Sequence, residues 1–223
     1  RSDEWEQYKE ELTKTFDQPE NAAEKVVNNF NDGTFFLPFD DWKKHFTNLF
    51  VALNFPDNWV GRRIQGSWTG ETGGNRDMGT WRTNTKIHLK LSNPNPKTCK
   101  VVDGKTYVEA FVGLYIKDSR LVMGFNYFKD PLYATPLSFD IVTADDFDKD
   151  PKERAKITHG LIRDMKGGKP SQPPYNFGTT QIELMLEADK DYFIVPSLYR
   201  RDQKGTYFLQ VYADVQHMKL GEG

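Results

Sequence analysis

Three residues stand in the chain order of a thiol-protease triad: Cys99, His159 and Asn176. In such a site a thiolate attacks a carbonyl carbon, the His moves protons and the Asn orients the His. Cys99 lacks the surroundings of such a nucleophile, because it lies in Lys-Thr-Cys-Lys at a predicted hairpin strand and not at a helix N-terminus. The sequence therefore predicts an ordinary strand cysteine, and no peptidase activity for this chain by itself.

Four aspartates, Asp145, Asp146, Asp148 and Asp150, are candidate ligands for calcium. The last three match the first ligands of an EF-hand loop, but the required glycine is replaced by Pro151 and the twelfth-position glutamate by Ile157. Clustered carboxylates either bind a cation or repel one another, so a looser calcium site is one interpretation. The other is a solvated helix start, with Asp150 as N-cap and Pro151 in the first turn.

The remaining polar groups match no known type of site. The histidines 45, 88 and 217 share no metal-binding spacing, and His88 is expected on a solvent-facing strand surface. The glycine run at 66–74 lacks the Lys-Ser/Thr of a phosphate loop and is expected to permit tight turns. Three small basic clusters, Arg62/Arg63, Arg200/Arg201 and Lys97/Lys100/Lys105, are interpreted as solvated faces.

Composition is that of a soluble globular protein, with 37% hydrophobic and 28% charged residues in a chain of 223. The net charge of −2 provides no general field for nucleic acid or anionic lipid. No apolar run reaches the roughly 18 residues of a membrane span. A single cysteine fits a reducing compartment, so we expect a cytoplasmic protein. The chain begins Arg-Ser-Asp-Glu, and we expect it to be a piece of a longer protein.

Helical spacing of apolar residues marks the first part of the chain, to about residue 57. A short buried strand is expected at 35–37. Two apolar faces are large enough to be predicted interaction surfaces for an upstream domain or a partner protein. Their residues are Trp5, Tyr8, Leu12 and Phe16 on one face, and Phe39, Trp42, Phe46 and Phe50 on the other.

From about Trp59 the apolar period changes to two, which indicates strands. Asp103-Gly104 is typical of a tight hairpin turn between two of them. The predicted strands are 85–91, 99–102, one running to Ile116, 121–128, 137–143, 182–186, 192–195 and 207–215, with a helix at 151–165 and a loop at 167–175. Many short strands of this kind predict a mainly β fold, an antiparallel β-sandwich.

Five sequence blocks, in order, resemble the calpain family. Residues 32–47 (Asp-Gly-Thr-Phe-Phe-Leu-Pro-Phe-Asp-Asp-Trp-Lys-Lys-His-Phe-Thr) resemble the end of a calpain protease domain. Gly-Ser-Trp-Thr-Gly-Glu-Thr-Gly-Gly-Asn at 66–75 and Trp-Arg-Thr-Asn at 81–84 resemble the start of the calpain β-sandwich. Val-Gly-Leu at 112–114, and a last block made of 194–197 followed by 205–211, are similar to later strands.

The resemblance implies two domains: 1–57, a C-terminal remnant of a protease domain, and 58–223, a sandwich like domain III of the calpain large subunit. It places the catalytic Cys, His and Asn before Arg1, so the chain alone is expected not to be an enzyme. The sequence departs from the calpain family pattern at two places. Asn75 stands where the family usually has a non-nucleophilic cysteine, and the family's acidic loop falls at 92–105, which is neutral to basic here.

Three functions are compatible with these observations. The first is a non-catalytic calpain-like module that binds protein partners, within a cytoskeletal or other large assembly. The second is the regulatory part of an active calcium-dependent cysteine endopeptidase, and it differs from the first only upstream of Arg1. The third is a calcium- or phospholipid-responsive membrane module, which the neutral loop at 92–105 disfavours. No cofactor is expected other than calcium at the four aspartates.

Overall fold

The computed structural model describes residues 38–49, 54–70, 74–117, 132, 134–149 and 172–222. The chain divides into two compact units, Arg1–Leu53 and Asn54–Gly223. The predicted strands 35–37 and 121–128, the predicted helix 151–165 and all helical positions before residue 38 lie outside the described residues.

In the first unit the described element is helix α3 (Phe39–His45). Pro38 precedes it, and Asp40 and Asp41 lie in its first turn with basic residues in its last, as the helix dipole favours. The helix ends at Phe46, whose backbone is extended and whose N–H still donates to Trp42 O. The predicted helix is therefore confirmed, although it stops before Phe50.

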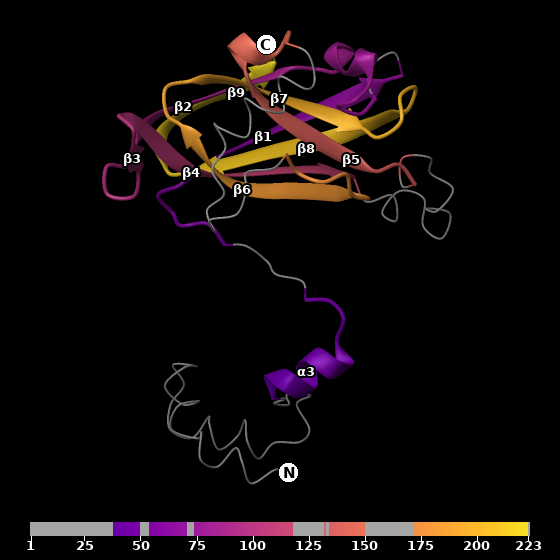
Figure 1. Cartoon of the computed structure of the whole chain (residues 1–223), viewed down its shortest axis with the longest axis horizontal. Helices are drawn as coiled ribbons and strands as arrows, with labels where there is room; N and C mark the ends of the chain where they lie inside the picture. The colour runs from indigo at the N-terminus through magenta and orange to yellow at the C-terminus, as the bar shows by residue number, and fades with distance from the viewer. Residues whose placement is uncertain are drawn as a thin grey trace. The chain divides into compact units, whose positions relative to one another are not determined.

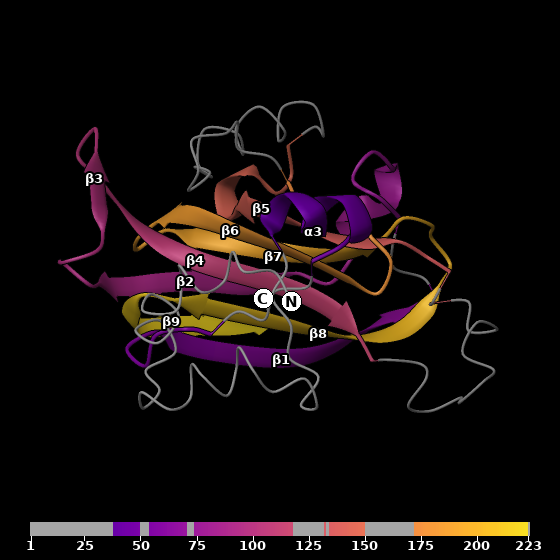
Figure 2. The ribbon, with the colours of Figure 1, turned by 90° about the horizontal axis from the view of Figure 1, so that it is seen from below.

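The second unit holds two antiparallel sheets (Figure 1). The first sheet has the order β1 (Val60–Thr69), β8 (Lys204–Ala213), β4 (Lys105–Ile116) and β6 (Thr179–Glu187). The short strand β3 (Lys100–Val102) pairs with the start of β4 on the side of β8, and this hairpin projects from the sheet (Figure 2). All of its pairings are antiparallel.

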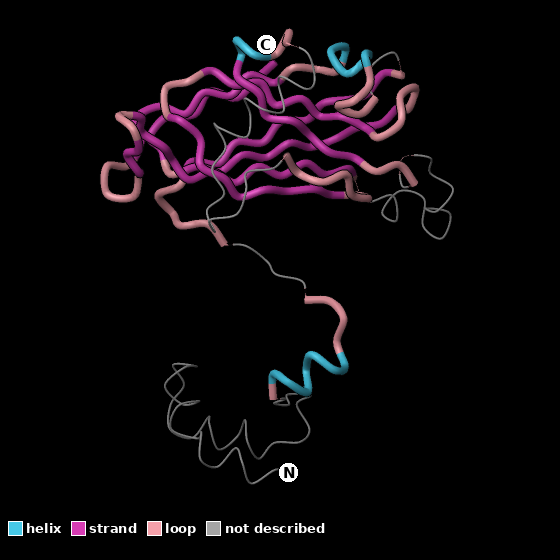
Figure 3. Tube along the Cα trace, in the orientation of Figure 1, coloured by secondary structure: helices cyan, strands magenta, loops and turns pink. Residues whose placement is uncertain are grey.

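The second sheet has the order β5 (Leu137–Thr143), β7 (Asp191–Leu198), β2 (Ile87–Pro94) and β9 (Val215–Glu222). Two 3₁₀ helices, η2 (Gly79–Thr83) and η4 (Ala144–Asp146), accompany it (Figure 3). The prediction of a mainly β chain with antiparallel sheets is confirmed. In the described part of the chain, no helix combines the length and apolar character that a membrane crossing would require.

The two sheets pack face to face around one hydrophobic core. On β2 the alternate residues Ile87, Leu89 and Leu91 are fully buried, and Val112 and Leu114 of β4 meet them from the other sheet. Period-two alternation produces this arrangement, because successive side chains of a strand point to opposite faces. Burying each such side chain stabilises the fold by about 1.5–3 kcal/mol.

The predicted hairpin turn is confirmed by its backbone. Asp103 and Gly104 have φ of 52° and 73°, and Val102 pairs with Lys105 across them. Two positive φ angles in succession are those of the tight turn that suits the twist of a hairpin, and Asp-Gly is a preferred sequence for it.

The predicted single strand 207–215 is wrong. β8 ends at Ala213 and β9 begins at Val215 in the opposite sheet, so the chain changes sheets at Asp214. Alternation continues through this bend, which is why the sequence did not show it. Strand β1 also lay outside the predicted ranges, because Gly61, Arg62, Arg63 and Gly66 interrupt its apolar pattern.

Candidate functional site

Helix α3 presents an aromatic stripe made of Phe39, Trp42 and Phe46. The rings of Phe39 and Trp42, and of Trp42 and Phe46, have centroids 5.8 Å apart and are nearly parallel. Phe39 is 69% exposed and Phe46 is 45% exposed, and no residue of α3 is buried. The predicted partners on these two faces, Trp5, Tyr8, Leu12, Phe16 and Phe50, lie outside the described residues.

The acidic turn after β5 is organised by cations of the chain itself. Asp146 is buried, with Lys149 Nζ at 2.6 Å from its Oδ1 and the Thr143 hydroxyl donating to its other oxygen. Burial opposes ionisation of Asp146, but these hydrogen bonds and the Lys149 charge outweigh it, so the pKa of Asp146 lies below its usual value. Arg82 Nη2 donates to the carbonyls of Asp148 and Lys149.

This arrangement does not gather the four predicted calcium ligands. Asp145 and Asp148 are exposed, and Asp150 lies outside the described residues. In the described part, no group of three or more His, Cys, Asp or Glu side chains is placed to hold a metal ion. The calcium site stays a prediction.

Two of the three residues in thiol-protease order, Cys99 and Asn176, make backbone hydrogen bonds. Cys99 lies directly before β3, partly buried against the core, and its N–H donates to Asn95 O. Asn176 exchanges two backbone hydrogen bonds with Leu137 at the edge of β5, and His159 lies outside the described residues. No contact between Cys99 and a base is present among the described residues.

His88 is less exposed than the sequence predicted, at 16% of its side chain. Its Nε2 lies 2.6 Å from Asp191 Oδ1, and Lys90 Nζ lies 3.1 Å from the other oxygen. Hydrogen bonds from Lys90 and then His88 lower the pKa of Asp191. His88 therefore takes part in a surface ion-pair group on the outer face of the second sheet.

Sequence reasoning missed a buried polar network on the outer face of β5 and β7. Asp140 of β5 is 4% exposed, and it accepts a hydrogen bond from Trp81 Nε1 at 2.7 Å and pairs with Arg76 Nε at 3.1 Å. Arg76 Nη2 also donates to Ser138 Oγ and to Pro173 O. An aspartate in the middle of a predicted buried strand was the available signal, because a buried carboxylate needs a cationic or hydrogen-bonding partner.

Tyr175 extends the network to the neighbouring strand. Its hydroxyl lies 2.8 Å from Ser197 Oγ of β7 and accepts a hydrogen bond from Arg76 N. The Arg76 guanidinium lies over the Tyr175 ring at 5.1 Å. Burial raises the pKa of Tyr175, and the nearby Asp140 acts in the same direction. Ser138 and Ser197 are fully buried, so these hydroxyls join segments and are not accessible nucleophiles.

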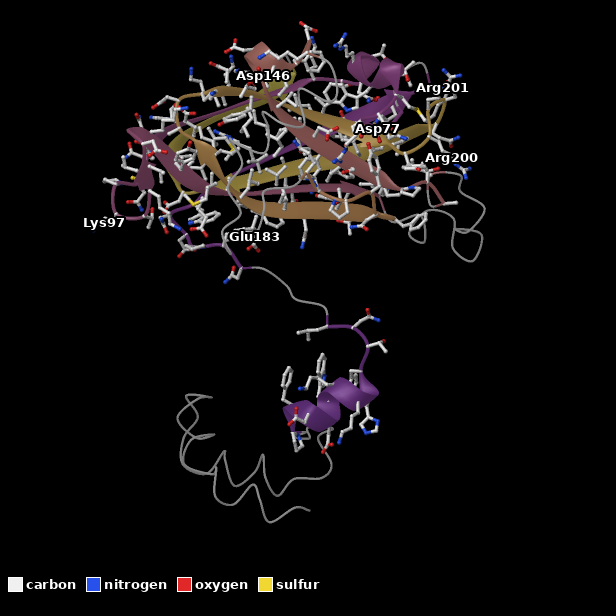
Figure 4. All side chains as sticks on the ribbon, in the orientation of Figure 1. Asp77, Lys97, Asp146, Glu183, Arg200 and Arg201 are labelled. Carbon is white, nitrogen blue, oxygen red and sulfur yellow. The ribbon has the colours of Figure 1, made fainter. Side chains whose placement is uncertain are left out.

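Three residues of the blocks that carry the calpain resemblance donate side-chain hydrogen bonds to backbone carbonyls of the second unit. Trp68 Nε1 donates to Pro196 O, Asn75 Nδ2 to Tyr199 O and Asn84 Nδ2 to Gly74 O. Asn75 thus ties the glycine run to the loop before Arg200 and Arg201, which lie at the same end of the unit as Asp77 (Figure 4). Gly74 has a φ of 95°, which a side chain would strain.

A second missed site is the bend at Asp214, which is 5% exposed. Its carboxylate accepts hydrogen bonds from Asn58 Nδ2, Asn95 Nδ2 and the Thr98 hydroxyl. Asn95 belongs to the 92–105 loop, where the resemblance placed an acidic calcium loop. In this chain the loop at 92–105 is held by the Asp214 carboxylate, which lies between β8 and β9 and accepts hydrogen bonds from Asn95 and Thr98.

Comparison of the sequence with models of known protein families and with curated proteins finds no match.

Proposed function

We propose that this chain is a non-catalytic, calpain-like interaction module, in which a β-sandwich supports an N-terminal segment that docks on a protein partner. The resemblance of the five sequence blocks supports the family part of this proposal. The observation that carries the interaction part is the exposed aromatic stripe of α3.

An aromatic stripe of this kind is costly in water. Each large apolar side chain left exposed forgoes about 1.5–3 kcal/mol of burial. Phe39, Trp42 and Phe46 have the i, i+3, i+7 spacing of the anchors by which an amphipathic helix enters an apolar groove. The described residues of the hydrophobic clusters all belong to the second unit, from Val60 on. The partner is therefore a protein with an apolar groove.

Covalent footprinting by mass spectrometry tests this function. Phe39 and Phe46 should label strongly in the purified chain and become protected in the native assembly from which the parent protein is isolated. Tyr199, which is 51% exposed in the second unit, is the reference that should label in both. Equal labelling of Phe39 and Phe46 in chain and assembly would exclude docking through α3.

The non-catalytic part is tested with a casein substrate and a thiol-directed covalent probe. We expect no turnover, because no base lies beside Cys99 among the described residues. Turnover that disappears in Cys99→Ser would contradict the proposal.

A further inference from the structure

Strand β5 is an edge of the second sheet whose own sequence gives it little protection against pairing with another strand. Its register with β7 runs without a bulge from Leu137↔Leu198 to Thr143↔Tyr192, and it contains no lysine, arginine or proline. Natural edge strands are commonly protected by such residues or by a bulge. Every residue of β5 is nevertheless buried, so the protection of this edge comes from another part of the chain.

The segment 172–176, here called the strap, covers this edge. Asn176 N donates to Leu137 O at 3.0 Å, and Leu137 N donates to Asn176 O at 2.8 Å. At the other end, the Gln172 side-chain amide takes the place of a peptide group, since it accepts from Ile141 N and donates to Ile141 O, both at 3.0 Å. The strap therefore satisfies backbone groups near both ends of β5 that another strand could otherwise bond.

Side chains and carbonyls hold the middle of the strap, because its two prolines have no N–H to donate. Pro173 O accepts hydrogen bonds from Ser138 Oγ at 2.8 Å and from Arg76 Nη2 at 2.9 Å. The Tyr175 hydroxyl lies 2.8 Å from Ser197 Oγ of β7. The strap thus covers the β5 edge without the continuous backbone ladder that a paired strand would form.

A second copy of β5 fits the edge that the strap covers. In a two-fold antiparallel pair centred on Phe139, Leu137 of one copy faces Ile141 of the other, so the backbone groups now bonded by the strap would bond one another. Asp140 then faces Ser138, and the two carboxylates do not lie opposite each other, which would oppose pairing. Aromatic and β-branched residues in β5 also favour a strand.

We infer that the strap protects the β5 edge from pairing with a second copy of the chain, and that β5 is the surface through which copies associate when the strap is loosened. Gln172 and Tyr175 hold the strap in place, through Ile141 and Ser197 respectively. Loosening the strap leaves backbone donors and acceptors of β5 to be satisfied by another strand. This surface is separate from the stripe of α3 and does not depend on the function proposed above.

The experiment compares the full chain with its double variant Gln172→Ala/Tyr175→Phe by sedimentation velocity over a range of concentrations. The matched control, Gln216→Ala/Tyr199→Phe, makes the same changes at exposed positions outside the strap. We expect the loosened variant to self-associate at a concentration about ten-fold or more below that of the wild type and the control. By hydrogen exchange, the amides of 137–143 should exchange faster in the dilute variant than in the wild type, and become protected as the variant associates.

Association of the loosened variant no stronger than that of the control would overturn the inference. Association that leaves the amides of 137–143 unprotected would do so as well, because another surface would then be responsible. Gln172→Ala alone, which keeps the contacts of Tyr175, is measured beside the double variant, and its failure to associate would decide against the inference if the double variant does not fold.

A peptide provides a second readout of strand pairing. The capped peptide Leu-Ser-Phe-Asp-Ile-Val-Thr, the sequence of β5, should dissociate the associated variant. The same peptide with N-methyl groups on alternate amides should have no effect, since strand pairing requires the peptide N–H groups. Equal action of the two peptides, or no action of either, would contradict pairing through β5.

Discussion

Asp140 is a single residue that connects several segments on the outer face of the second sheet. Its carboxylate joins Trp81 of η2 and Arg76 of the preceding loop to the middle of β5. Breaking a buried ion pair by removing one partner is strongly destabilising, because the other charge remains without compensation. Removing Asp140 is therefore expected to destabilise the fold, because the charge of Arg76 would remain without its partner.

Asp140→Asn should reduce the free energy of unfolding by about 3 kcal/mol, at the low end for a buried pair because the Arg76 side chain is 29% exposed. Urea denaturation measures this change. Asp77→Asn, an exposed aspartate near the same loop, is the control and should change little. A loss no greater in Asp140→Asn than in the control would show that the network is not a stabilising contact.

Glu109 provides a pH prediction at the same scale. Burial raises its pKa above the usual value, and Glu183 and Asp214 add to this against Lys100. Glu183 lies on the sheet face turned away from the second sheet (Figure 4). Because the folded-state pKa is above the unfolded one, the folded state binds this proton more tightly. The contribution of Glu109 is therefore favourable below the unfolded pKa, about 4.3, and is lost as the pH rises through the folded pKa.

Glu109→Gln should accordingly be more stable than the wild type at pH 7, with the difference shrinking towards pH 4. Thermal unfolding at both pH values measures it, with Asp145→Asn, an exposed position, as control. A variant that is less stable than the wild type at pH 7 would contradict the assigned cause of the pKa shift.

At the scale of elements, the polar groups of the acidic turn around η4 are engaged by cations of the chain itself. Lys149 neutralises Asp146, and Arg82 donates hydrogen bonds to the carbonyls of Asp148 and Lys149. Calcium requires six to eight oxygen ligands, so these groups would have to be displaced before it bound.

We predict little heat on titration of the chain with millimolar calcium, and none that depends on the 92–105 loop. Isothermal calorimetry measures this. A clear isotherm abolished by Asp146→Asn would place a calcium site at the acidic turn, and one unaffected by replacing all four aspartates with Asn would place it elsewhere.

At the scale of the whole molecule, the observed division between Leu53 and Asn54 lies four residues before the predicted one. Phe55 explains the difference, since its ring stacks on Tyr212 and contacts Phe111 and Trp59. Residues 54–57 therefore pack with the second unit. That residues 1–57 are a protease remnant stays a prediction.

Residues 54–223 should fold alone with cooperative unfolding, because every described residue of the two hydrophobic clusters lies within them. A truncation starting at residue 60 is the matched comparison. It should unfold at a lower temperature because it removes Phe55, whose ring packs on Tyr212 and Phe111, together with Trp59, which packs on Phe55. Calorimetry of both truncations tests this. Failure of 54–223 to unfold cooperatively would show that the first unit is needed for the fold.

Local patterns in the sequence were sufficient for several of the elements, though not for β1 or for the break between β8 and β9. Period-two alternation predicted β2, β4, β5 and β7, and Asp103-Gly104 predicted the hairpin, because strand faces and turn angles depend on neighbouring residues. The aromatic spacing predicted α3 and its stripe in the same way. Each of these signals is carried by residues a few positions apart.

Only the tertiary structure decided which groups meet. The pairing of Asp140 with Arg76, the hydrogen bonds of Asn58 and Asn95 to Asp214, and the hydrogen bonds of Gln172 at the β5 edge all join residues far apart in the chain. Alternation of apolar and polar residues predicts that one face of a strand is buried, but it does not predict which other strands cover that face. That choice depends on how the two sheets pack around a shared core and on which polar groups this packing removes from water.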